Sequence, residues 1–262
     1  MGEKLMIIDT DCGIDDAQAI MLALAAPSVR VLGLTCCFGN TDVENVCQNV
    51  LRVLTVCQRT QVSLVALGPL TNLALAVRLD PTFPQKLKNL YIMGGNMEGK
   101  GNVTPSAEFN FIMDPESAYI VLEEYQCPTS IATWEFTCRN KLTWEFFDEL
   151  VGQDSAPARF MKRVTSRCWA FSRDAGVGMK EAFFGPGFVP YDAYAMAACV
   201  DGSVVTGQQE YAVRVELLGE LGRGFMALDP TNKLKKSHRV SVMTSCDLSR
   251  FKSMLMRSLQ QP

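Results

Sequence analysis

The run Asp-Thr-Asp-Cys-Gly-Ile-Asp-Asp at residues 9–16 places four carboxylates within eight residues of the chain. Carboxylates a few ångströms apart repel one another, so sharing a small volume requires a cation or a raised pKa. Ligands that are all oxygen atoms favour a hard ion, calcium or magnesium. The alternative is a solvated acidic loop that caps a helix, but a cap needs one aspartate and not four. The spacing therefore predicts a site for a divalent metal ion.

Two predicted elements position this acidic cluster. Residues 5–8 form a short apolar run typical of a buried strand, and the apolar residues between 17 and 24 follow helical spacing. Asp15 and Asp16 then lie at the N-terminus of the helix, where negative charge is favoured. Ligands of an open α/β sheet bind at the carboxyl ends of its strands. The cluster is therefore expected at a functional edge of the sheet.

Strand and helix patterns alternate through the first half of the chain, which predicts an α/β fold with a mostly parallel open sheet and flanking helices. Strands are expected at 29–37, 62–67 and 90–93, and helices at 43–54, 70–79 and 114–125. The second half predicts helical and small-strand additions, with helices at 141–150, 156–173 and 192–200 and strands at 204–205, 211–217, 225–228 and 240–243. Since no linker is visible, residues 1–262 are expected to form a single domain.

Composition narrows the expected partners and compartment. The net charge of −3 and pI of about 5.4 give no basic surface for nucleic acid or an anionic membrane. No apolar run approaches the roughly twenty residues that span a bilayer. The ten cysteines are scattered without metal-ligand spacing, as expected in a reducing compartment. Because the first strand begins almost at Met1, no signal peptide is expected, and the protein is predicted to be cytoplasmic.

Several motifs together resemble one known family. They are the acidic run at 9–16, Phe38-Gly39-Asn40, Ala66-Leu67-Gly68-Pro69-Leu70-Thr71-Asn72, Met93-Gly94-Gly95, Gly101-Asn102-Val103-Thr104-Pro105 and Ala107-Glu108-Phe109-Asn110. In this order they are similar to motifs of the inosine–uridine-preferring nucleoside hydrolases. The similarity covers nearly the whole chain and is strongest up to about Asp114. The resemblance implies a nucleoside hydrolase-like α/β domain, commonly homo-oligomeric, that uses one calcium ion to cleave ribonucleosides into ribose and free base.

The resemblance also assigns roles to individual residues. The calcium ligands would be Asp11, Asp16, the main-chain carbonyl of Leu67 and Asp192, with Asp11 also acting as the general base on water. The ribose hydroxyls would be held by Asp15, Asn102, Glu108 and Asn110, with Asn40 in the same pocket. Hydrolysis passes through an oxocarbenium-like sugar, whose positive charge nearby carboxylates favour. The alternatives are a solvated loop for Glu108 and Asn110 and a helix N-cap for Asp192.

Two departures from the family pattern bear on activity. Many members have a histidine as general acid where this chain has Tyr191, and a phenol with pKa near 10 is a poorer acid at neutral pH. The chain's single histidine, His238, is expected on the surface. The tryptophans, Trp134, Trp144 and Trp169, are expected in the core, with stacking on a base as the alternative.

The second departure is a missing segment. Family members have a further strand, a loop and a helix between the positions of Arg59 and Val62, which only Thr60 and Gln61 separate here. Losing that loop would open the pocket and admit water, which weakens its electrostatics. The chain is therefore predicted to be a shortened hydrolase whose activity is weak or lost.

Two other functions remain open at this stage. One is a non-catalytic protein that binds calcium and a ribosyl group. The other is a magnesium-dependent phosphohydrolase of the haloacid dehalogenase type, in which Asp9 would be the nucleophile and Asp11 its neighbouring acid. That class also needs a later lysine and a second acidic pair, which are not evident, and it gives no role to residues 107–110.

Overall fold

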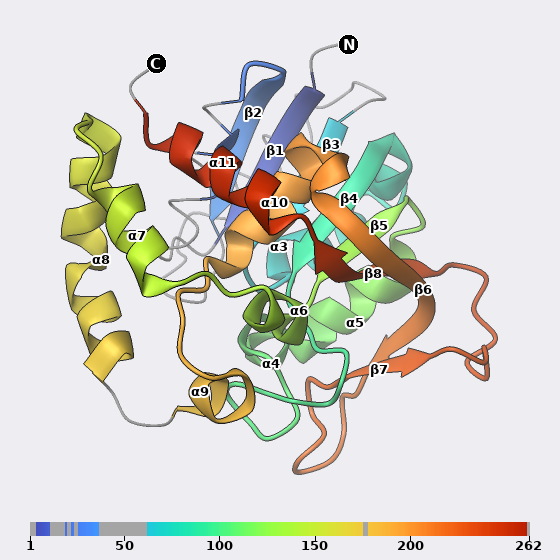
Figure 1. The fold of residues 1–262 in the computed structure, drawn as a ribbon. Coiled ribbons are helices and arrows are strands. Elements are labelled where there is room, and N and C mark those ends of the chain that lie inside the picture. The colour runs from blue at the N-terminus through green and yellow to red at the C-terminus, as the bar shows by residue number, and fades with distance from the viewer. Residues whose placement is uncertain are drawn as a thin grey trace.

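The computed structural model describes residues 4–10, 19, 22–23, 26–36, 62–174 and 178–260. Within them lies one sheet with the strand order β2-β1-β3-β4-β5-β8-β6-β7 (Figure 1). Its strands are β1 (Lys4–Thr10), β2 (Val29–Cys36), β3 (Val62–Ala66), β4 (Leu87–Met93), β5 (Thr129–Ala132), β6 (Val205–Val215), β7 (Met226–Asp229) and β8 (Val240–Cys246). β1–β5 and β8 pair in parallel, whereas β6 pairs antiparallel with both β8 and β7. The predicted mostly parallel α/β sheet is confirmed.

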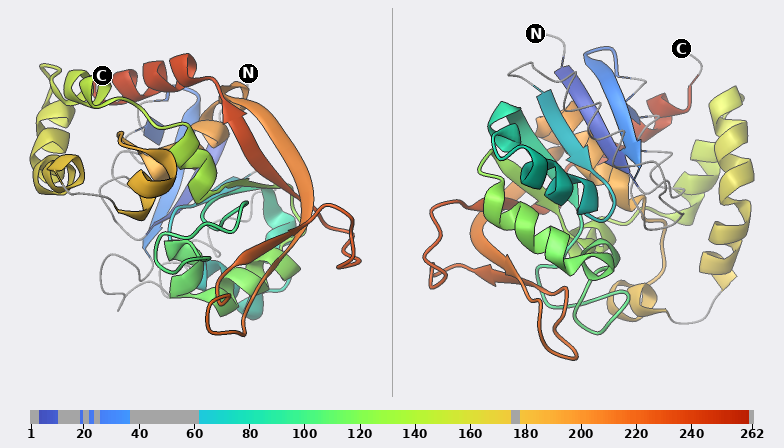
Figure 2. Two further views of the ribbon diagram at one scale, coloured as in Figure 1. Left: turned by 60° about the horizontal axis from the view of Figure 1, so that its bottom comes forward. Right: turned by 180° about the vertical axis from the view of Figure 1, so that it is seen from behind.

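Helices cover both faces of this sheet. One face carries α6 (Trp134–Arg139), α7 (Trp144–Val151), α10 (Tyr191–Val200) and α11 (Leu248–Ser258). The other carries α3 (Thr71–Leu79) and α5 (Pro115–Glu124), which are seen from behind in Figure 2. The short α4 (Phe109–Met113), α8 (Ala156–Asp174), α9 (Met179–Phe184) and the 3-10 turns η1 (Phe83–Lys86) and η2 (Gly202–Val204) complete the described elements.

A hydrophobic cluster lies on each face of the sheet, and alternate side chains of β1 contribute to one or the other. Met6 and Ile8 pack into the hydrophobic cluster under α10, and Ile7 packs into the cluster under α3 and α5. All three side chains are at most 1% exposed. A strand buried on both faces reads as a continuous apolar run, which is the pattern that predicts β1.

The direction of α10 places its first turn at the functional edge. The Lys4 ammonium, at the amino end of β1, donates to the carbonyls of Cys199 and Val200 at the C-terminus of α10. The helix therefore runs opposite to the parallel strands. Its N-terminus, with Tyr191 and Asp192, points toward their carboxyl ends.

Most predicted elements agree with the structure within a few residues. The predicted helix start at 114 is confirmed, because an Asp114 carboxylate oxygen accepts from the Ser117 N–H at 3.0 Å. The two separate strands predicted at 204–205 and 211–217 are wrong, since β6 is continuous through a polar, largely exposed stretch. β5, α6, α9 and α11 were not predicted. β5 and α9 are too short for periodicity to reveal them.

Some predictions concern residues at the ends of the described ranges or outside them. The predicted helix at 43–54 lies outside it. Ala19, Leu22 and Ala23 are helical and buried, in agreement with the helix predicted after the acidic run. β2 is the end strand of the described sheet. None of the helices in the described ranges combines the length and apolar character needed to cross a membrane.

Candidate active site

The buried side-chain amide of Asn110 hydrogen-bonds to the backbone at the ends of both β3 and β4. Leu67 follows β3, and its N–H donates to the Asp9 carbonyl of β1 at 2.7 Å. The Asn110 Nδ2 donates to the carbonyl of Leu67 at 3.2 Å and to that of Met93 at 3.0 Å. Asn110 is only 4% exposed. The loop after β3, the end of β4 and α4 therefore meet at one point of the carboxyl edge.

Glu108 binds the backbone around it through both carboxylate oxygens. Oε1 accepts from the Asn110 N–H at 2.9 Å, and Oε2 accepts from the Gly95 N–H at 2.8 Å and the Phe111 N–H at 3.3 Å. Burial raises the pKa of Glu108 to about 7, against the opposing effect of these three donors. The alternative of a solvated loop is wrong for Glu108 and Asn110, since both side chains are buried.

Glycines allow the backbone to pass closely around this point. Gly95 has a φ of 66°, and a Cβ there would lie 2.9 Å from the Phe111 ring. A Cβ on Gly101 would lie 2.1 Å from the Thr104 carbonyl. Side chains at these positions would displace the loop from 94 to 107.

Two polar side chains hold the middle of this loop. The Asn102 Oδ1 accepts from the Phe109 N–H at 2.9 Å, which orients Asn102 toward α4. Asn96 is fully buried; its Nδ2 donates to the Ser106 carbonyl at 2.9 Å, and its Oδ1 accepts from the Met226 N–H of β7 at 3.0 Å. The β6–β7 hairpin thereby supports the loop that carries Asn102.

Glu135 is a supporting residue that the sequence did not indicate. Its side chain is fully buried in the first turn of α6. Oε2 accepts from the Met97 N–H at 2.8 Å, and Oε1 accepts from the N–H groups of Glu98 and Lys100 at 2.9 and 3.2 Å. Burial raises its pKa, and its charge also contributes to the raised pKa of Glu108. No local motif marks this role, because its partners are distant in sequence.

The first turn of α10 brings a buried acid to the same edge. Asp192 is 4% exposed and is the second residue of α10. The N-cap residue is Pro190, so the alternative that Asp192 caps the helix is wrong. Tyr191 is half-buried and lies near the Cys138 thiol, whose pKa burial raises to about 12. Near a helix N-terminus, the charge of Asp192 is favoured.

The oxygen atoms that the described residues could offer to a metal ion suit a hard cation. The Leu67 carbonyl and the buried carboxylates of Asp192 and Asp9 supply oxygen only, and Asp9 Oδ1 accepts from Asn72 at 3.1 Å. Within the described ranges, no three His, Cys, Asp or Glu side chains gather closely enough to hold a metal. The remaining predicted residues, Asp11, Asp15, Asp16 and Asn40, lie outside those ranges.

Trp134 lies just after the carboxyl end of β5, where its backbone N–H donates to the Gly95 carbonyl at 3.1 Å. Trp134 is 1% exposed and packs edge-on against Phe184, which confirms core packing for this residue. Trp144 and Trp169 pack against each other with ring centroids 5.9 Å apart. His238 is half-buried, so the surface prediction is wrong, and burial lowers its pKa. It precedes β8, whose first residues lie at the amino end of the sheet.

The family model described as inosine–uridine preferring nucleoside hydrolase matches residues 6–62 and 57–253. The inosine-uridine preferring nucleoside hydrolase of Crithidia fasciculata is 26% identical, with 98% of each chain covered. "Probable uridine nucleosidase 1" of Oryza sativa subsp. japonica is 33% identical over 44% of this chain, and the chain spans about half of that protein's length, 54%.

Solved structures give the same result over nearly the full chain. An inosine-guanosine nucleoside hydrolase superposes with a TM-score of 0.84 at 27% identity, covering 98% of both chains. The plant nucleoside hydrolase PpNRh1 gives 0.84 at 26% identity, covering 99% of both. The two family-model segments meet at 57–62, and the Crithidia alignment extends over 318 positions for a chain of 262 residues. Both findings agree with the missing segment predicted between Arg59 and Val62.

Proposed function

Because the chain belongs to the inosine–uridine preferring nucleoside hydrolase family, we propose that it hydrolyses the N-glycosidic bond of ribonucleosides to give ribose and a free base. The observation that carries this proposal is the meeting of Leu67, Glu108, Asn110 and Asp192 at one edge of the sheet. These residues come from three segments, the loop after β3, the start of α4 and the first turn of α10, and the three polar side chains are at most 4% exposed. Family membership also favours hydrolysis of nucleosides over the phosphohydrolase alternative.

The proposed cofactor is calcium. Asp11, Asp16, the Leu67 carbonyl and Asp192 would hold the ion, and the oxygen-only donors among the described residues support a hard cation. A bound calcium ion lowers the pKa of a coordinated water and orients a substrate through its hydroxyls. Asp11 would take the proton from the attacking water as general base.

The hydrogen bonds of the site define how it would hold ribose. An ionised carboxylate has about four lone-pair sites, and Glu108 uses three of them for backbone N–H groups. One site is left for a sugar hydroxyl. Asn110 commits both Nδ2 hydrogens to carbonyls, so its Oδ1 would accept from a hydroxyl. Asp15, Asn40 and Asn102 would complete the ribose pocket, as the resemblance implies.

The weakest part of the proposed machinery is protonation of the leaving base. Tyr191 occupies the position of the family's histidine, and a phenol with pKa near 10 is a poorer acid at neutral pH than an imidazole. General acid assistance contributes about 10²–10⁴-fold, so hydrolysis is expected to be slow. This observation favours a second candidate, a protein that binds calcium and a ribosyl group without turnover.

One experiment distinguishes these two functions. Ribose release from inosine, uridine, adenosine and cytidine is measured with calcium and with a chelator, using wild type, Asp11→Asn and the exposed control Asp154→Asn. Calcium-dependent release that Asp11→Asn abolishes and Asp154→Asn retains supports the hydrolase. No release, together with calcium-dependent binding of a nucleoside in calorimetry, contradicts the hydrolase and supports the binding protein.

We further expect a homo-oligomer in the cytoplasm, with a ribonucleoside as the small-molecule partner. The oligomeric state follows from the resemblance alone. Light scattering on the purified chain measures it directly, and a mass equal to the 28.9 kDa chain would contradict it.

A further inference from the structure

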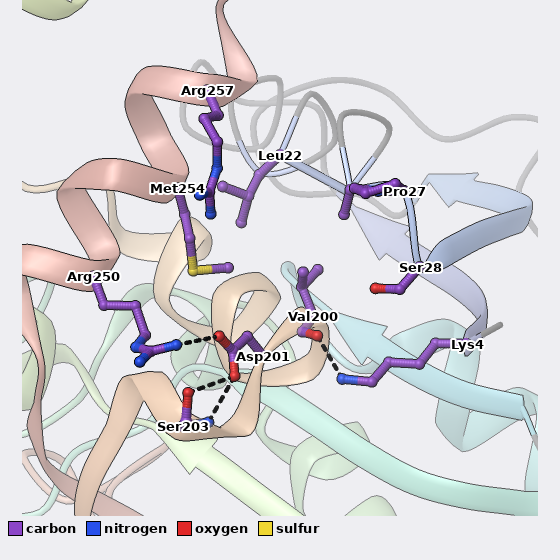
Figure 3. Close-up of a pocket in the computed structure, with 11 residues that line it drawn as sticks. Lys4, Leu22, Pro27, Ser28, Val200, Asp201, Ser203, Arg250, Met254 and Arg257 are labelled. Atoms are coloured by element: carbon purple, nitrogen blue, oxygen red, sulfur yellow. Dashed lines mark hydrogen bonds and ion pairs between the residues drawn. The ribbon is translucent and has the colours of Figure 1, made fainter. Parts of the chain in front are cut away.

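A cavity lies at the opposite end of the sheet from the candidate active site. Its volume is about 680 Å³, within the range of small-molecule sites. The described lining comes from the amino end of β1, the turn before β2, the C-terminal end of α10, η2 and α11 (Figure 3). Lys4 marks this as the amino edge, since it is the first residue of β1.

One stripe of α11 forms a wall of this cavity. Arg250, Met254 and Arg257 are spaced by four and three residues, so they lie on one face of the helix. Figure 3 shows the Arg257 side chain extending from α11 toward Leu22. Met254 is 5% and Leu22 3% exposed, which gives this part of the cavity an apolar surface. A basic group and an apolar surface therefore lie side by side.

The charges of the described lining are unbalanced. Lys4, Arg250 and Arg257 are cationic, and Asp201 is the single acid among the described lining residues. Asp201 is already engaged: Oδ2 accepts from Arg250 Nη1 at 3.0 Å, and Oδ1 accepts from the Ser203 N–H and hydroxyl. No carboxylate or carbonyl of the described residues accepts from the Arg257 guanidinium. Its charge is available to a ligand.

We propose that this cavity binds a small organic anion, with its acidic group on Arg257 and its apolar body against Leu22, Val200 and Met254. An inorganic ion would leave most of the 680 Å³ unfilled, whereas an aromatic body with one acidic group would also contact the apolar lining. A guanidinium matches the geometry of carboxylate, sulfonate and phosphate groups. The Lys4 and Arg250 charges add a favourable field. The inference does not rest on hydrolase activity.

The test uses two fluorescent probes that differ in charge. The aromatic sulfonate 8-anilinonaphthalene-1-sulfonate is titrated into the full chain, and the neutral N-phenyl-1-naphthylamine provides the comparison. Variants are Arg257→Gln, Arg257→Glu and the control Lys252→Gln, which removes a charge from α11 outside the cavity. Circular dichroism and thermal unfolding verify that each variant is folded.

The expected result is one sulfonate site whose Kd rises about tenfold or more in Arg257→Gln and further in Arg257→Glu. Lys252→Gln should bind the sulfonate as wild type does, and the neutral probe should bind more weakly and equally to all four proteins. Equal sulfonate affinity in wild type and both Arg257 variants would overturn the proposal. So would a neutral probe that binds as tightly as the sulfonate.

Discussion

Replacing Glu135 by glutamine tests whether this buried carboxylate positions the loop of the candidate active site. Glu135 accepts three backbone N–H groups, from Met97, Glu98 and Lys100. Glutamine has one acceptor oxygen, so at least one buried N–H would face an amide NH₂ group. An unsatisfied buried donor costs about 1–3 kcal/mol. Because burial penalises the ionised form of Glu135, removing its charge offsets part of this cost. We therefore expect a net loss near 1 kcal/mol, or about 2–4 °C in Tm.

Hydrogen exchange and steady-state kinetics measure the effect of Glu135→Gln. Hydrogen exchange of the peptide that contains residues 97–100 should accelerate by about fivefold or more, because 1 kcal/mol corresponds to a factor of that size. The kcat/KM for ribose release should fall by about tenfold or more, since small misplacements in a site are costly. The matched control is Glu145→Gln, an exposed glutamate in the first turn of α7. Exchange and activity that match this control would refute the positioning role.

Three further predictions concern the same edge. Asn110→Asp removes both donors to the Leu67 and Met93 carbonyls and should lower the free energy of unfolding by about 2–4 kcal/mol in denaturant titrations; a loss no larger than that of the exposed control Asn232→Asp would argue against it. In chelator, the folded chain keeps a proton on Glu108 that the unfolded chain loses between pH 4.5 and about 7. The free energy of unfolding should therefore fall by up to ~3 kcal/mol as pH rises through this window, relative to Glu108→Gln; parallel curves for the two proteins would contradict the raised pKa. Tyr191→His should raise kcat for inosine about 10²-fold by supplying a general acid, and an unchanged kcat would show that leaving-group protonation is not limiting.

Local patterns in the sequence predicted the features whose causes are local. Asp114 followed by Pro115 predicted a capped helix start, and the continuous apolar run in β1 predicted a strand buried on both faces. Glu108 and Asn110 were identified through a motif. Their hydrogen bonds to Gly95, Leu67 and Met93 are visible only in the folded chain.

Residues that act through distant partners could not be predicted in this way. Asn96 and Glu135 have no motif, because their partners are backbone groups that the fold brings to them. His238 was expected on the surface, and packing before β8 buries half of it. α11 was not predicted, although Phe251, Met254 and Leu255 follow the i, i+3, i+4 spacing of a helix.

The bond from Met226 to Asn96 has a consequence for how the protein is made. These residues are 130 positions apart, and the β6–β7 turn is also joined to the loop through Ser106 and Leu221. A nascent chain that has left the ribosome only as far as α10 already contains every predicted catalytic and binding residue. It still lacks the strand that holds the Asn102 loop in place. During synthesis, hydrolytic competence should thus be acquired only after the C-terminal strands emerge, and premature termination before β7 should yield an inactive chain that has lost none of those residues.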